Sequence, residues 1–162
     1  MSFKTCKTPS AALAVLNKVW INSADFEQLF GSSSAVLSLC TSPEYPTLTS
    51  VVGPADDVQS GFIGVNEAQR TFLAVPLGKN VTYSIIDVME VAHLASITFS
   101  VKKAKSTSTP TIVAQDLIAF VKSHYTKHPF YLNHPFTICF QSSYYVLTVS
   151  AMDFADLSSF KK

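Results

Sequence analysis

Short β-forming runs, each ended by turn residues, limit the folds open to this chain. In the first half these runs of β-branched or alternating residues occupy positions 19–21, 35–40, 47–52, 61–65 and 81–86. Turn-forming residues separate them: Gly31 with three serines, Ser42-Pro43, Gly53-Pro54 and Leu77-Gly78. Many short strands at close spacing predict a small barrel or sandwich.

The second half has a different organisation, with one predicted helix between strands. A strand at residues 96–101 precedes a basic loop at 102–109. Thr109 is predicted to cap the helix and Pro110 to take its first position, with Pro129 ending it. Its apolar stripe consists of Val113, Leu117, Phe120 and Val121.

A predicted hairpin at residues 136–140 and 144–149 completes the chain's regular structure. A strand, helix and hairpin after a β-rich half predict two subdomains. We place the junction near residues 87–92.

The composition excludes some classes of protein. Apolar residues make up 48% of the 162 residues and charged residues 14%, which allows a buried core and argues against disorder. The net charge of +1 gives no global attraction to nucleic acid or anionic membranes, so a charged partner site must be a local patch. Cys6, Cys40 and Cys139 show no CxxC spacing and are expected to be free thiols. No run approaches the roughly 18 apolar residues of a membrane span, so we expect a soluble cytosolic protein.

No convincing catalytic constellation is present. His124 and His128 are four residues apart, and His134 is close enough in sequence to be a third metal ligand. A surface pair at a helix end is the favoured interpretation. Asp56-Asp57 follows a turn and is expected to be solvated, and Cys139 is expected to be a buried structural thiol. P-loop, GxGxxG and GxSxG motifs are lacking.

Local positive charge offers two candidate partner sites. Lys102, Lys103 and Lys105 lie in the basic loop, where contact with an acidic partner and simple solvation are both open. Arg70 lies at the edge of an ordered element and can make bidentate contacts to a carboxylate.

Several segments form a recognisable series in sequence order. They are residues 17–22 with Asp25-Phe26, residues 36–43, Gln69-Arg70 with Phe72, then Leu77-Gly78 and Val81, residues 116–122, Phe130 with the hairpin 136–149, and Ala151-Met152-Asp153. The series resembles the N domain of the NSF (N-ethylmaleimide-sensitive factor) family of vesicle-fusion AAA ATPases. It covers about residues 17–153, nearly the whole chain.

The resemblance implies a fold and a function. The implied fold is mixed β and α/β: a double-ψ β-barrel at residues 1–87, a smaller α/β subdomain with one main helix at 92–153, and the start of a linker at 154–162. In the family, the N domain binds the adaptor SNAP on SNARE complexes, for SNARE disassembly in vesicle fusion and protein transport. Other domains bind ATP and Mg²⁺ and form the hexamer. The chain stops before any Walker motif, so we expect a monomeric, non-catalytic binding module without a cofactor, recruited to membranes through SNAP and SNAREs.

Members of the family bind SNAP through basic residues, and the resemblance therefore implies which residues of this chain bind the partner. Arg70 falls on the family's arginine. Thr71 replaces the lysine that follows it, and residues 87–91 lack the family's lysines and carry Glu90. Our hypothesis is that Lys79, or the loop with Lys102, Lys103 and Lys105, supplies the missing charge.

Two other classes remain as alternatives. The related N domain of the valosin-containing protein class recruits ubiquitin-pathway adaptors through a similar groove. A small double-ψ barrel enzyme would need convergent polar residues in a pocket. Three ligands brought together from His124, His128 and His134 would support the enzyme.

Overall fold

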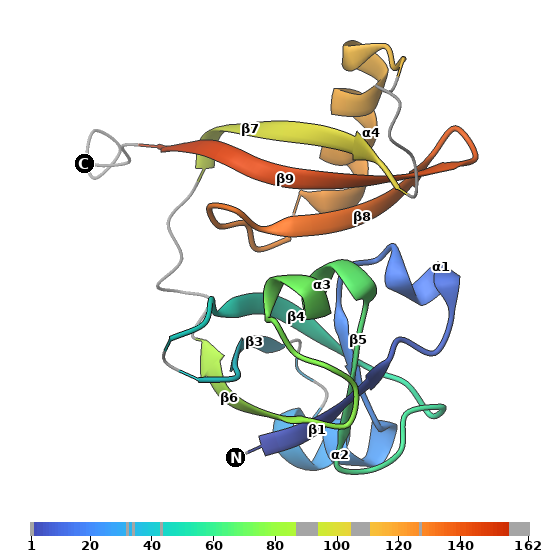
Figure 1. The fold of residues 1–162 in the computed structure, drawn as a ribbon, viewed down its shortest axis with the longest axis vertical. Helices are drawn as coiled ribbons and strands as arrows, with labels where there is room; N and C mark the ends of the chain where they lie inside the picture. The colour runs from blue at the N-terminus through green and yellow to red at the C-terminus, as the bar shows by residue number, and fades with distance from the viewer. Residues whose placement is uncertain are drawn as a thin grey trace.

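The chain folds into two lobes stacked along its long axis (Figure 1). The computed structural model describes residues 2–31, 33, 35–42, 44–86, 94–104, 111–126 and 128–155. Residues 2–86 form a barrel lobe and residues 94–155 a sheet lobe. The predicted junction at 87–92 lies outside the described residues.

The barrel lobe is a closed six-stranded barrel of mixed direction. Its strands are β1 (Ser2–Lys7), β2 (Val19–Ile21), β3 (Ala35–Cys40), β4 (Leu48–Pro54), β5 (Phe62–Val65) and β6 (Asn80–Ile86). The order is β1-β5-β2-β4-β3-β6, and β6 closes the barrel by pairing with β1. The β1–β5 and β2–β4 pairs are parallel, and the other four are antiparallel.

Apolar side chains from every strand fill the barrel. The core is made of Phe3, Val19, Ile21, Ala35, Leu37, Leu39, Leu48, Val52, Ile63, Val65, Leu73, Val75 and Val81. Alternation explains the choice of residues, since successive side chains of a strand point to opposite faces. Each buried aliphatic side chain contributes about 1.5–3 kcal/mol relative to an exposed one.

The Gly53-Pro54 pair belongs to β4, so the prediction that it ends the strand before Gly53 is wrong. Gly53 and Pro54 pair with Trp20 and Ile21 of β2. A Cβ on Gly53 would lie 2.8 Å from Cζ3 of Trp20. Glycine is therefore retained here because the indole ring packs directly against the backbone.

Three short helices cover the ends of the barrel: α1 (Ala11–Ala14), α2 (Ser23–Phe30) and α3 (Glu67–Phe72). Each begins at a polar N-cap whose side chain accepts a backbone N–H: Ser10, Asn22 and Asn66. Asn66 and Gln69 form a reciprocal capping box with bonds of 2.9 and 3.0 Å. Because α2 begins at Ser23, the Asp25-Phe26 segment is helical. No described helix is long and apolar enough to cross a membrane.

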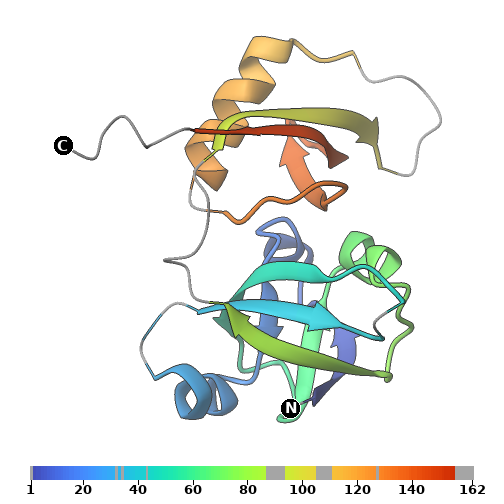
Figure 2. The ribbon, with the colours of Figure 1, turned by 90° about the vertical axis from the view of Figure 1, so that its left-hand side faces the viewer.

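The sheet lobe is a three-stranded antiparallel sheet with one helix. Its elements are β7 (Leu94–Lys103), α4 (Ala114–Tyr125), β8 (Pro135–Phe140) and β9 (Ser143–Phe154), with strand order β7-β9-β8. Helix α4 lies across one face of the sheet (Figure 2). The core between them contains Leu117, Val121, Tyr125, Phe136, Ile138, Phe140, Tyr145 and Leu147. The predicted hairpin is confirmed, with Gln141 and Ser142 both at positive φ in a two-residue turn.

Helix α4 begins later than predicted. Val113 is its N-cap, in an extended conformation and without a side-chain cap, and 59% of Val113 is exposed. Thr109 and Pro110 lie outside the described residues. The β-branched run at 111–113 favours extended backbone, and Asp116 in the first turn suits the helix dipole. The buried stripe is Leu117, Val121 and Tyr125.

Strands β2 to β9 were all predicted, with bounds that differ by a few residues. β1 was not, although residues 2–7 alternate clearly. The buried Phe3 and Thr5 point inward, and the exposed Lys4 lies between them. Lys102 and Lys103 were predicted in a loop, but they extend β7 by pairing with Val146 and Tyr145.

Asn17, which is fully buried, joins the two lobes. Its Nδ2 donates to the carbonyl of Thr137 at 2.7 Å, and its Oδ1 accepts from the N–H of Thr137 at 2.7 Å. Its backbone carbonyl accepts from Ser50 and Gln69 in the barrel. Asn17 adopts a left-handed backbone with φ of 53°. Thr137 belongs to β8, so one side chain ties the barrel to the sheet lobe.

Substituting Asn17 with alanine tests this joint. We expect Asn17→Ala to lower the free energy of unfolding by about 3 kcal/mol, because it leaves both backbone groups of Thr137 buried without partners. Urea denaturation followed by circular dichroism measures the change.

Asn133 provides the matched control, because it is exposed and also left-handed, with φ of 63°. Asn133→Ala carries only the backbone cost of about 1 kcal/mol. Equal losses for the two variants would show that the Asn17 amide does not stabilise the junction.

Candidate functional site

Strand β1 places two lysines on the outer surface of the barrel. Lys4 and Lys7 are both exposed, and their register partners are Phe62 and Val65 on β5. Neither lysine was singled out from the sequence. The alternation of residues 2–7 could have placed Lys4 on the outside, whereas Lys7 is exposed because it is the last residue of the strand.

Arg70 lies beside the end of β1 because it bonds to the backbone of the neighbouring strand β5. Its Nη1 donates to the carbonyl of Val65 at 2.6 Å, and Val65 is the register partner of Lys7. Burial raises the pKa of the Cys6 thiol, and the nearby Arg70 charge opposes that rise. One part of the guanidinium is therefore fixed to the barrel, and its remaining donors are available for a carboxylate.

Lys79 is held next to β1 by a tight turn. The N–H of Thr5 donates to the Lys79 carbonyl at 2.8 Å, and the N–H of Gly78 donates to the Thr5 carbonyl at 2.7 Å. Gly78 has φ of +77°, a conformation that glycine adopts without strain. The Lys79 side chain is exposed.

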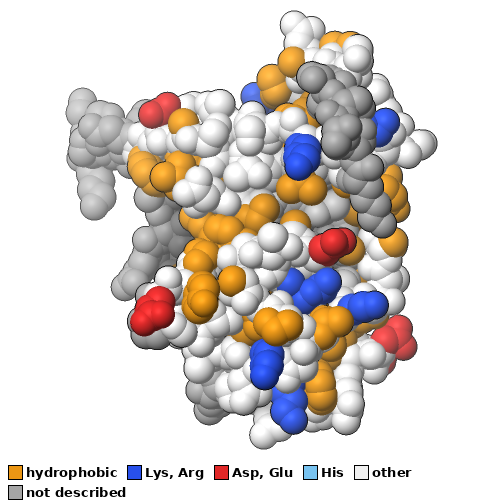
Figure 3. Space-filling view, viewed as in Figure 1, with side chains coloured by type: hydrophobic (Ala, Val, Ile, Leu, Met, Phe, Trp, Pro, Cys, Tyr) orange, Lys and Arg blue, Asp and Glu red, His pale blue; other side chains and the backbone are white. Residues whose placement is uncertain are grey.

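Lys4, Lys7, Arg70 and Lys79 thus surround β1, and we call them the basic barrel face. Figure 3 shows Lys and Arg side chains gathered on the barrel lobe, with apolar side chains between them. No ion pair joins any of the four to a described carboxylate. Asp25 is bonded elsewhere, accepting from Ser60 Oγ and the N–H of Gly61, both at 2.8 Å.

The other predicted partner-binding residues lie on the sheet lobe. Lys102 is exposed and Lys103 is half-buried, both at the end of β7. Lys105 lies outside the described residues. The structure therefore brings Arg70 and Lys79 together and places Lys102 and Lys103 on the other lobe.

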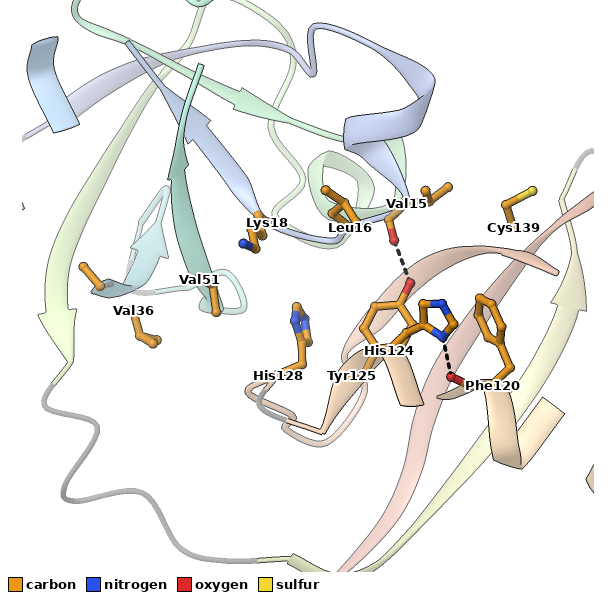
Figure 4. A pocket seen from close by; sticks show the side chains of 11 residues that line it. Val15, Leu16, Lys18, Val36, Val51, Phe120, His124, Tyr125, His128 and Cys139 are labelled. Atoms are coloured by element: carbon orange, nitrogen blue, oxygen red, sulfur yellow. Dashed lines mark hydrogen bonds between the residues drawn. The ribbon is translucent and has the colours of Figure 1, made fainter. Parts of the chain in front are cut away.

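A cavity of about 720 Å³ lies between the lobes (Figure 4). Apolar side chains of both lobes line most of it, together with Lys18, His124, Tyr125, His128 and Cys139. Cys139 is half-buried at the cavity wall, so the prediction of a buried thiol is wrong. Tyr125 closes one side, because its hydroxyl donates to the Val15 carbonyl at 2.6 Å. Burial raises the pKa of Tyr125 to about 12, which keeps this donor protonated.

Two histidines are packed at the lobe junction without good hydrogen bonds. His134 is fully buried, and its ring stacks on Tyr131 with centroids 4.2 Å apart. Its ring nitrogens and Nε2 of His128 make no hydrogen bond of good geometry to the described residues. Burial lowers the pKa of His128 to about 4, helped by the Lys18 charge. Burial and His128 lower that of His134 to about 3, against a weak opposing contribution from the Pro129 carbonyl.

The described residues do not form a metal site. No group of three or more His, Cys, Asp or Glu side chains among them is placed to hold an ion. His124 stacks on Phe120, and its Nδ1 lies 2.9 Å from the Phe120 carbonyl. The three histidines therefore do not converge as ligands. Asp56 and Asp57 lie in an exposed turn, as expected.

Comparison with known proteins adds no family assignment. No family model matches the chain, and no curated protein matches its sequence.

The buried histidines predict a loss of stability in mild acid. An unfolded histidine titrates near pH 6.5, whereas folded His128 and His134 stay neutral down to about pH 4 and 3. Between these values the unfolded state binds more protons, so stability falls as the pH falls. From pH 7.5 to 5.0 we expect each histidine to cost about 2 kcal/mol, measured by urea denaturation.

His134→Phe tests the assignment, since phenylalanine retains the stacked ring and cannot be protonated. The variant should gain about 2 kcal/mol relative to the parent between pH 7.5 and 5.0. Parallel stability curves for the two proteins over that range would contradict the role of His134.

Proposed function

We propose that this chain is an adaptor-binding module, the N domain of an NSF-like ATPase that recruits SNAP–SNARE complexes. The main support for the proposal is the basic barrel face. Two of its residues, Arg70 and Lys79, were expected at the partner site, and the fold adds Lys4 and Lys7 beside them. Cations that pair with no described carboxylate favour an acidic protein partner.

The strand topology of the barrel and the composition of the second lobe support the same proposal. We propose that the barrel is of the double-ψ type that the NSF resemblance implies. Two parallel pairs, β1–β5 and β2–β4, within an otherwise antiparallel barrel support this. A following α/β lobe with one main helix agrees with the expected second subdomain.

A binding role also fits the chemistry of the described residues. Burial raises the pKa of the Cys6 thiol, which disfavours the thiolate nucleophile, and the histidines at the junction are packed and neutral at pH 7. We therefore propose a non-catalytic module whose ATP and Mg²⁺ chemistry belongs to other domains. SNAP would bring the protein to membranes from the cytosol.

The cavity between the lobes favours a second candidate. Valosin-containing-protein-like N domains use a groove between subdomains for ubiquitin-pathway adaptors, and this chain has a cavity in a comparable place. Ubiquitin-pathway adaptors therefore belong in the same binding assay as SNAP. Binding of those adaptors without SNAP would move the protein to that class.

Reversing charge on β1 tests the NSF-like proposal. The double variant Lys4→Glu, Lys7→Glu should bind purified SNAP about tenfold more weakly than the parent at low salt, with less difference at higher salt. Both side chains are exposed, so the fold should be retained. Biolayer interferometry with the chain at high surface density measures this and lets several weak contacts add.

Lys122→Glu is the matched control, an exposed lysine on α4 of the sheet lobe. It should leave the affinity for SNAP unchanged. Equal affinities for the parent and the double variant would remove β1 from the partner surface. Absence of SNAP binding by the parent at high density would refute the proposed function itself.

A further inference from the structure

The cavity between the lobes contains a lysine that pairs with no described carboxylate. Lys18 lines the cavity and is half-buried, and it makes no hydrogen bond or ion pair to a described residue. No carboxylate is among the lining residues that the structure describes. A partly desolvated ammonium group attracts an anion more strongly than one in bulk water.

The walls around Lys18 are mostly apolar and come from both lobes. Val36 and Val51 approach from the barrel, whereas Phe120 of α4 lies at the other end of the cavity, beyond Tyr125 and His124 (Figure 4). The volume of about 720 Å³ lies within the roughly 300–1,000 Å³ typical of small-ligand sites. Such sites combine apolar walls with a few polar groups that orient the ligand.

The backbone under Lys18 is rigid. Its neighbours Asn17 and Val19 are both fully buried, and Asn17 is bonded to both lobes. A charged group on a fixed backbone loses less freedom when it binds a ligand.

His128 faces the same space from the sheet lobe. Its Nε2 is buried and has no partner among the described residues. Figure 4 shows the Lys18 and His128 side chains directed toward one region of the cavity. The neutral His128 ring therefore forms part of the wall beside Lys18.

We propose that this cavity binds a small amphipathic organic acid, with its carboxylate at Lys18, beside the His128 ring, and its aromatic or branched aliphatic body against Val36 and Val51. An apolar molecule without charge would leave Lys18 unpaired, and a small inorganic anion would leave the apolar walls empty. The ligand touches both lobes, so its binding stabilises their docking. This site is separate from the basic barrel face and does not depend on adaptor binding.

Titration of the ¹⁵N-labelled chain with 3-phenylpropionate tests the site. We expect saturable shifts of amide signals from residues that line the cavity in both lobes, with a dissociation constant on the order of 1 mM for so small a probe. The neutral isostere 3-phenylpropanol should bind about tenfold more weakly, because it lacks the charge that pairs with Lys18. Equal shifts from the acid and the alcohol would overturn the proposal.

Variants at Lys18 test whether its ammonium group binds the carboxylate of the probe. Lys18→Met, which keeps an apolar side chain of similar length, should weaken binding of 3-phenylpropionate about tenfold, whereas Lys18→Arg should retain it. Lys122→Met is the control for losing an exposed lysine and should bind like the parent. Thermal unfolding of each variant verifies the fold, and unchanged binding by folded Lys18→Met would overturn the proposal.

A parallel titration with a peptide distinguishes a small organic acid from a protein segment that carries the same apolar and acidic groups. The blocked tripeptide acetyl-Phe-Glu-Val-amide presents an apolar body and one carboxylate. Cavity shifts with 3-phenylpropionate that depend on Lys18 support the proposal whether or not the tripeptide also binds. Shifts with the tripeptide and none with the acid would overturn it in favour of a partner segment.

Discussion

The amide of Asn17 is the interaction on which the arrangement of the two lobes depends. It bonds both the N–H and the carbonyl of Thr137, as the backbone of a neighbouring strand would. Thr137 belongs to β8, an edge strand of the sheet lobe. An unpaired edge invites association with other chains, so one side chain both protects the edge and fixes the sheet to the barrel. Gln69, from the capping box of α3, bonds the Asn17 carbonyl and couples helix formation to the junction.

Aromatic packing extends this junction beyond the hydrogen bonds. Phe72 of α3 contacts Tyr131, and Tyr131 stacks on His134. The rings give the junction a neutral apolar interior, which explains why the histidine pKa values are low. Close packing between the lobes removes water from the two histidine rings and so disfavours their protonated forms. Acid therefore destabilises the docking of the lobes, because it favours states in which the histidines are exposed and protonated.

The two candidate binding regions follow from different parts of this architecture. The basic barrel face belongs to one lobe, because closure of the barrel through β1 brings Arg70 and Lys79 beside Lys4 and Lys7. The cavity exists only between docked lobes, since its walls come from β3 and β4 on one side and from α4 on the other. A change in docking would therefore alter the cavity and leave the basic face intact.

Local patterns made most elements predictable, and the errors have identifiable causes. Alternation predicted β2 to β9, but β1 was overlooked although residues 2–7 alternate too. The helices α2 and α3 were missed because they are short, yet Asn22 and the Asn66–Gln69 capping box were readable start signals. Helix α4 begins after the position that the Thr-Pro cap signal predicts, because the β-branched run at 111–113 favours extended backbone.

The sequence by itself predicted strands β2 to β9 and a smaller subdomain after the barrel, because periodicity is a local property of a chain. Only the tertiary structure decided which residues meet. Asn17 and Thr137 are 120 positions apart, and nothing in the residues near Asn17 specifies that partner. Lys4 and Lys7 joined the basic face, and Lys18 the cavity, through barrel closure and lobe docking. Such contacts depend on the packing of the whole chain, which no local pattern records.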